Sequence, residues 1–211
     1  MNIARIADSE KQYQYIKIWD PFIRAWHWLI VASVVSGWLL GEFRTFSVMQ
    51  WHIYCGYMTG VLLVLRIVWG FLGPRAVRFS TLSVHPQHLL SYTKTIFNRQ
   101  PSAIAGHNPL GALSVMIMLA LLAVQVVSGL FSEDDGLFYS GPFSSMLSSA
   151  MVVKMTAIHG YFSRLVLAIV LLHVAAVLFY LVWKKENLIR AMITVEKLVK
   201  KADSNNHSHI D

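Results

Sequence analysis

The sequence has few of the charged residues that cover a soluble domain. Charged residues make up 14% of its 211 residues, whereas hydrophobic residues make up 55% and the mean hydropathy is +0.51. A soluble domain has about 25% charged residues. So small a charged fraction argues against a soluble globule, and so large a hydrophobic fraction excludes a disordered chain.

Cysteine is nearly absent: Cys55 is the single cysteine in the chain. One cysteine excludes a disulfide framework within the chain and a CxxCH haem-attachment motif. It also excludes zinc or iron–sulfur sites built on cysteine ligands. Any metal chemistry must therefore depend on other side chains.

Aspartate and glutamate are missing from the four longest apolar runs, which cover residues 25–41, 48–71, 109–131 and 155–183. A bilayer core of about 30 Å is crossed by about 20 helical residues. The runs are apolar nearly all round, whereas a helix of a soluble bundle keeps a polar stripe. We therefore predict an all-α integral membrane protein, a bundle of four transmembrane helices.

The distribution of positive charge predicts the orientation of this bundle. Lys and Arg are concentrated before the first run, between the second and third runs, and after the fourth. The opposite side carries Arg44 and Lys154 together with an acidic run at residues 133–135. The positive-inside rule then places both termini in the cytoplasm. No basic–aromatic motif accompanies the charge, so we expect no nucleic-acid partner.

The same pattern divides the chain into three parts. We expect a cytoplasmic N-terminal arm at residues 1–21, a four-helix domain at residues 22–195, and a disordered cytoplasmic tail at residues 196–211. His207 and His209 in the tail are expected to be solvated rather than metal-binding.

Four histidines lie in the runs or near their ends: His27, His52, His159 and His173. Intramembrane histidine is uncommon and is by default a functional hypothesis, although a single one is more often structural. His159 and His173 are 14 residues apart, which is about 21 Å along a helix and within about 40° of the same face. Antiparallel packing can pair His52 with His159 and His27 with His173, if the fourth helix continues past Trp183.

Two histidine pairs at two depths fit two bis-histidine haems. Imidazole is a good iron ligand, and two imidazoles fill both axial positions, which favours electron transfer over oxygen activation. A separation of about 21 Å excludes one zinc or copper site made from all four histidines. A proton relay would be expected to use intramembrane acidic residues, and the runs contain none.

Arg66 and Arg164 are the charged residues inside the runs, and both are candidate partners of haem propionates. The alternative for Arg66 is a side chain that snorkels to the membrane surface. The alternative for Arg164 is a polar contact between helices. Arg164 follows His159 by five residues, which turns it about 140° away.

Several motifs carry a resemblance to a known family. In chain order these are Trp19-Asp20-Pro21, Arg24, His27-Trp28, His52, Gly56-Tyr57, Arg66, Trp69 to Pro74 (WGFLGP), Arg78-Phe79, Gly106 to Gly111 (GHNPLG), Ser128 to Phe131 (SGLF), His159 and His173. Over about residues 17–190 this order resembles the bacterial cytochrome b561 and Ni/Fe-hydrogenase B-type cytochrome superfamily.

The resemblance implies that the four histidines are axial ligands of two haem b groups. It also implies that the chain carries electrons across the bacterial inner membrane, between a periplasmic redox partner and membrane quinone. The partner would be a c-type cytochrome, a hydrogenase or another dehydrogenase. Some members oxidise superoxide directly, so a superoxide:quinone oxidoreductase is the alternative. His107 is not needed as a ligand, which leaves it either a role at a helix start or one in quinone binding.

Overall fold

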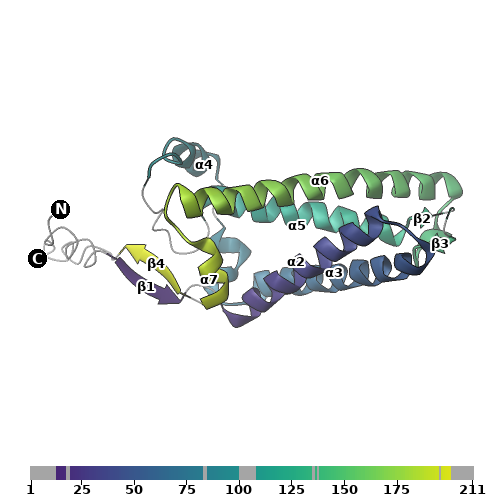
Figure 1. The fold of residues 1–211 in the computed structure, drawn as a ribbon, viewed down its shortest axis with the longest axis horizontal. Helices are drawn as coiled ribbons and strands as arrows, with labels where there is room; N and C mark the ends of the chain where they lie inside the picture. Colours follow the sequence, from purple (N-terminus) through teal and green to yellow (C-terminus); the bar gives the residue numbers. More distant parts are fainter. Residues whose placement is uncertain are drawn as a thin grey trace, which may run out of the picture.

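The computed structural model describes residues 13–17, 20–82, 85–99, 108–134, 136, 138–194 and 196–200. Four long helices form an elongated bundle (Figure 1). They are α2 (Pro21–Glu42), α3 (Phe46–Leu72), α5 (Pro109–Leu130) and α6 (Ser149–Val182). All four are long and apolar enough to cross a membrane, which confirms the predicted bundle.

Short elements occupy the two ends of the bundle (Figure 1). One end, here the β2 end, carries β2 (Glu133–Asp134), β3 (Tyr139–Ser140) and η3 (Ser144–Met146). The other, here the α7 end, carries β1 (Tyr13–Lys17), η1 (Arg75–Val77), η2 (Phe79–Thr81), α4 (Pro86–Thr93), α7 (Leu188–Thr194) and β4 (Glu196–Lys200). β1 pairs antiparallel with β4, and β2 with β3.

Two of the long helices begin in the same way. Asp20 caps α2 by accepting a hydrogen bond from the Ile23 backbone N–H at 2.8 Å, and Asn108 caps α5 by accepting one from Gly111 at 2.8 Å. A proline follows each cap, where its missing N–H costs nothing. Both helices that start at the α7 end are therefore fixed by local sequence.

The long helices pack closely as α2 on α3, α3 on α5 and α5 on α6. Between α2 and α3, the Ser33 hydroxyl donates to the Cys55 carbonyl at 2.9 Å and lies 2.8 Å from the Thr59 hydroxyl. Gly37 allows close approach there, because a Cβ at this position would lie 3.3 Å from the Cys55 Cβ. Small residues and hydrogen bonds are the usual means of joining helices in lipid.

The fourth helix ends earlier than the sequence would permit. α6 ends at Val182, and Trp183 is its C-cap. Lys185 has a φ of 57°, and this left-handed conformation separates α6 from α7. Continuation past Trp183 was the condition that we set for pairing His27 with His173, but these two residues lie near enough to interact without it.

The tail also differs in part from our expectation. Residues 196–200 form β4, whose backbone pairs with β1 from Tyr13↔Lys200 to Lys17↔Glu196, so this part is ordered by the opposite end of the chain. Residues 201–211, with His207 and His209, lie outside the described residues, as does His107.

Candidate functional site

His52 and His159 face each other at the β2 end of the bundle. His52 lies on α3 and His159 on α6, and their ring centres are 6.0 Å apart with the ring planes at 89°. Metal–imidazole bonds of about 2.0–2.1 Å place two imidazoles on opposite sides of one metal with ring centres about 6 Å apart. The observed spacing is compatible with one metal held between the two imidazoles.

Each of these histidines is held by a backbone carbonyl of a neighbouring helix. Nδ1 of His52 lies 2.8 Å from the Gly37 carbonyl on α2, and Nδ1 of His159 lies 3.0 Å from the Gln125 carbonyl on α5. A carbonyl oxygen only accepts, so both Nδ1 atoms donate. With Nδ1 as the donor, each Nε2 carries the lone pair that could bind a metal, and bonds of this kind orient metal-ligating histidines. In the structure the Nε2 of His159 lies 3.3 Å from the Gln125 amide nitrogen.

A glycine stands four residues after each of these two carbonyls. In an α-helix the N–H at position i bonds to the carbonyl at i−4, so a side chain four residues on crowds that carbonyl. A Cβ at Gly41 would lie 2.9 Å from Cε1 of His52, and a Cβ at Gly129 would lie 2.8 Å from Cε1 of His159. Both glycines are therefore part of the site, a role that we did not predict from the sequence.

Gln125 is a second residue that sequence reasoning missed. Its side-chain nitrogen lies 3.3 Å from Nε2 of His159, and its Oε1 is buried without a hydrogen-bond partner in the described part of the chain. The signal that could have found it is a polar amide in an otherwise apolar run. Gln125 thus contacts the metal-binding atom of His159 from α5.

His27 and His173 form the second pair, toward the α7 end. They lie near enough to interact electrostatically, and His27 sits against Trp28 with ring centres 5.3 Å apart. Nδ1 of His27 is buried and has no hydrogen-bond partner among the described residues. A buried polar atom without a partner is costly, so this atom marks a place that suits a polar ligand.

Arg66 lies at the α7 end of α3 and is 4% exposed, so it does not snorkel. Its guanidinium donates to the Val77 carbonyl at 3.2 Å and lies 4.8 Å from the ring centre of Phe79. One nitrogen, Nη1, is buried without a hydrogen-bond partner in the described residues. Arg66 therefore fixes the segment after α3 and keeps one donor for an anion.

Arg164 and Arg44 are both exposed. Arg164 is on the exposed face of α6, and its pairing with a haem propionate stays a prediction. Arg44 forms an ion pair with Asp134 at 3.3 Å at the β2 end. Exposed ion pairs of this kind contribute about 0–1 kcal/mol to the free energy of unfolding.

Four helices of spanning length define a helical membrane protein, and they bring imidazoles together in pairs that are candidate metal sites. The chain matches the prokaryotic cytochrome b561 family over residues 18–195. It therefore belongs to this family, which is the family that the sequence motifs indicated.

Curated relatives agree with this assignment. The chain is 23% identical to a probable Ni/Fe-hydrogenase B-type cytochrome subunit of Rhizobium leguminosarum bv. viciae, over 94% of this chain and 96% of that protein. It is 24% identical to a probable Ni/Fe-hydrogenase 1 B-type cytochrome subunit of Escherichia coli K12, over 60% of this chain and 64% of that protein. The second alignment thus spans somewhat less than two thirds of the relative. No solved structure matches the chain.

The family and the four spanning helices establish the general role. This is a multi-pass bacterial membrane protein, a b-type cytochrome that acts in electron transfer. Its cofactor is haem b.

Proposed function

We propose that His52 and His159 hold one haem b, that His27 and His173 hold a second, and that electrons pass through both across the inner membrane. The observation that supports this most strongly is the His52/His159 pair. Its spacing of 6.0 Å and its two Nδ1–carbonyl contacts are compatible with a bis-histidine iron site. The proximity of His27 to His173 supports the second site.

A bound haem supplies a one-electron carrier, and the protein supplies its ligands and surroundings. The carbonyls of Gly37 and Gln125 hold the two rings in fixed orientations, so little rearrangement is needed when charge changes. Gly41 and Gly129 keep the space that the rings occupy. The free Nη1 of Arg66 is placed to donate to a propionate at the α7 end, and Arg164 is the further candidate for a propionate.

The positive-inside pattern places the α7 end in the cytoplasm and the β2 end in the periplasm, with both termini cytoplasmic. The His52/His159 site then lies near a periplasmic electron donor. Because the relatives are named as hydrogenase cytochrome subunits, we expect a hydrogenase as the first partner to test. A c-type cytochrome or another dehydrogenase are the other partners, and membrane quinone accepts electrons at the cytoplasmic level.

Reconstitution into liposomes tests this function. The haem-loaded protein is placed in vesicles with decylubiquinone in the bilayer, and a hydrogenase with hydrogen is added outside. We expect reduction of the haem spectrum followed by formation of quinol, and neither in vesicles without the protein. If the haems are reduced and quinone is not, the quinone end of the proposal is wrong.

The same liposomes test the alternative function, direct oxidation of superoxide. Superoxide added without any partner protein should leave the haems oxidised if the chain only relays electrons from a docked donor. Rapid haem reduction by superoxide, with no reduction by hydrogenase, would replace our proposal by the superoxide:quinone oxidoreductase.

A further inference from the structure

A group of buried and half-buried polar side chains lies at the α7 end, outside the histidine sites. We call it the corner cluster, and it consists of Tyr92, Asn108, Tyr180, Lys184 and Glu186. These residues come from α4, the cap of α5, the end of α6 and the connection to α7. Tyr180, Lys184 and Glu186 are 6%, 3% and 7% exposed.

The members of the corner cluster are connected to one another. The hydroxyls of Tyr92 and Tyr180 lie 2.7 Å apart, and the Asn108 amide donates to the Tyr180 hydroxyl at 3.0 Å. Nζ of Lys184 lies 5.4 Å from both tyrosine ring centres. Glu186 interacts electrostatically with Lys184 and with Tyr180. Four groups that can carry a proton thus lie together, with a hydrogen bond between the two tyrosines and with Lys184 and Glu186 beside them.

Stability alone does not explain this arrangement. Burying a Lys–Glu pair costs several kcal/mol of desolvation per ion, and well-packed apolar residues often do as well or better. The Asn108 oxygen already caps α5, so the helix start does not need Tyr180. Burial lowers the pKa of Lys184, opposed by the charge of Glu186, and this makes the ammonium a readier proton donor.

The corner cluster lies in line with the nearer histidine pair. Tyr180 follows His173 by seven residues, which is about 10.5 Å along α6 and within about 20° of the same face. Side chains of a helix tilt toward its N-terminus, so the Tyr180 hydroxyl extends in the direction of His173. At the other side of the cluster, Lys185 and Asn187 are exposed. The cluster therefore lies between water and the depth of His173.

Charged side chains next to the corner cluster, in the described part of the chain, include Arg99 and the exposed Lys185. Arg99 lies over Trp183, next to Lys184, with its guanidinium 4.4 Å from the ring centre. The titratable side chains of the cluster are Tyr92 from α4, Tyr180 from α6, and Lys184 and Glu186 from the connection to α7. A Lys balanced by a Glu is a poor anion site, but it can pass a proton without a net change of charge.

We propose that the corner cluster takes up the protons that membrane quinone needs when it is reduced at the His27/His173 level. This inference rests on the proposed function. Reduction of one quinone to hydroquinone consumes two electrons, supplied by the donor, and two protons from water at the α7 end. Each proton passes through Glu186 and Lys184 to the Tyr92–Tyr180 pair and then to a quinone oxygen.

The test measures reoxidation of the dithionite-reduced, haem-loaded full chain by decylubiquinone, in ordinary and heavy water and across pH. Removing the Tyr180 hydroxyl with Tyr180→Phe should slow reoxidation at least about tenfold, since a positioned proton donor contributes about 10²- to 10⁴-fold. It should also change the pH profile and the solvent isotope effect. Haem content, absorption spectrum and haem reduction by the donor should stay as in wild type.

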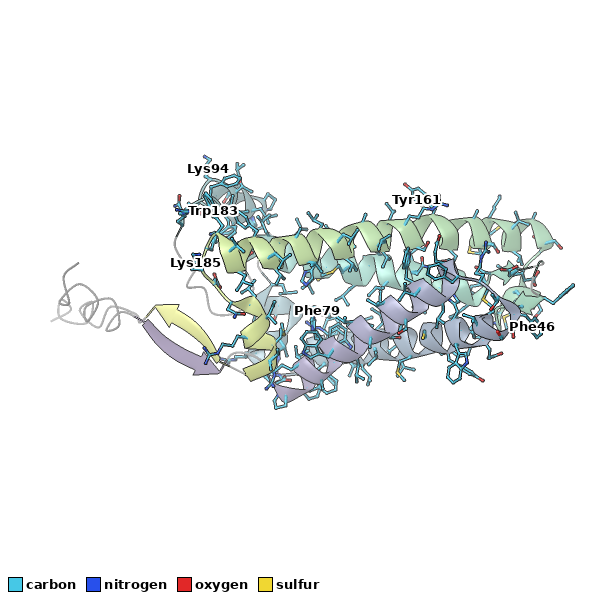
Figure 2. All side chains as sticks on the ribbon, in the orientation of Figure 1. Phe46, Phe79, Lys94, Tyr161, Trp183 and Lys185 are labelled. Atoms are coloured by element: carbon cyan, nitrogen blue, oxygen red, sulfur yellow. The ribbon has the colours of Figure 1, made fainter. Side chains whose placement is uncertain are left out.

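Tyr161→Phe is the matched control. Tyr161 is on the same helix but 61% exposed, and Figure 2 shows it on the outer side of α6. It should behave as wild type in every measurement. Tyr92→Phe and Glu186→Gln change other members of the corner cluster, which lie outside α6. They keep the inference testable if Tyr180→Phe does not bind haem.

Redox-difference infrared spectra give a readout apart from turnover. A carboxyl band that changes when quinone is added, and that Glu186→Gln removes, supports proton passage through this residue. The inference is overturned if quinone reoxidises wild type and all three variants at the same rate with the same isotope effect. If quinone does not reoxidise wild type, the proposed quinone acceptor is wrong, and the inference fails with it.

Discussion

At the scale of single residues, the positions of the paired histidines at the β2 end depend on backbone carbonyls and on glycines of the neighbouring helices. The carbonyls of Gly37 and Gln125 hold the imidazoles, and the absence of a side chain at Gly41 and Gly129 lets the rings reach these carbonyls. His52 and His159, on different helices, are thus held by the same arrangement, a backbone carbonyl followed four residues later by a glycine. The chemistry of the site is set as much by the neighbouring helices as by the histidines.

Gly129→Ala tests this arrangement. The new Cβ would lie 2.8 Å from Cε1 of His159, closer than such atoms approach, so the ring must leave the Gln125 carbonyl. We expect haem content to fall from about two to about one per chain in a pyridine haemochrome assay. Gly160→Ala on α6 has nothing within 4 Å and should bind haem as wild type does. Equal haem content in both variants would count against this arrangement.

Arg66→Met tests the anchoring role of a buried guanidinium. The variant loses the charged hydrogen bond to Val77 and the contact with Phe79, so we expect the free energy of unfolding to fall by about 1–3 kcal/mol. Thermal unfolding in detergent measures this. Arg75→Met removes an exposed arginine nearby and should change little. Equal unfolding temperatures for the two variants would show that Arg66 anchors nothing.

At the scale of elements, the connection between α6 and α7 brings charge into a buried corner. Lys185 ends α6 in a left-handed turn, and Lys184 and Glu186 on either side of it point inward. This connection is also a place that the sequence left open, because Lys184 to Val195 permit a longer helix than α6. An apolar run followed by helix-compatible residues shows how long a helix can be, but the turn at Lys185 depends on what the buried neighbours require.

Other elements were predictable for clear physical reasons. Apolar runs of spanning length with at most one charged residue each have no stable arrangement in lipid except helices, so α2, α3, α5 and α6 follow from composition. The meeting of His52 with His159 follows from the alternating course of the four helices, which starts α3 and α6 at the same end of the bundle. The roles of Gly41 and Gln125 did not follow, because they depend on which carbonyl faces which ring across two helices.

Lys184 predicts a specific pH dependence of stability. Burial lowers its pKa in the folded state, so between that value and the ordinary value of 10.5 the unfolded chain binds more protons than the folded one. Stability contributed by this residue therefore rises with pH in this window. The unfolding temperature of wild type should increase relative to that of Lys184→Met as pH is raised from neutral toward that value. A constant difference would contradict the lowered pKa.

At the scale of the whole molecule, the two ends of the bundle differ in what they offer. The β2 end presents short turns and the Arg44–Asp134 pair, whereas the α7 end presents basic segments, α4, α7 and the β1–β4 ribbon (Figure 1). This asymmetry suits a protein that exchanges electrons with different partners on the two sides of a membrane.

Cysteine labelling tests the orientation, because Cys55 is the chain's only cysteine and can be removed by Cys55→Ala. In that background, Ser145→Cys at the β2 end should react with a membrane-impermeant maleimide in spheroplasts. Ser91→Cys at the α7 end should react only after lysis. The reverse pattern would place the termini in the periplasm.

Haem content of ligand variants tests the central claim most directly. If each iron is held by one pair of imidazoles, purified wild type should contain about two haem b per chain, and His159→Ala and His173→Ala about one each. The low-spin signals that survive in the two variants should be different ones. Two haems retained in either variant, or the same signal lost in both, would contradict the pairing of His52 with His159 and His27 with His173.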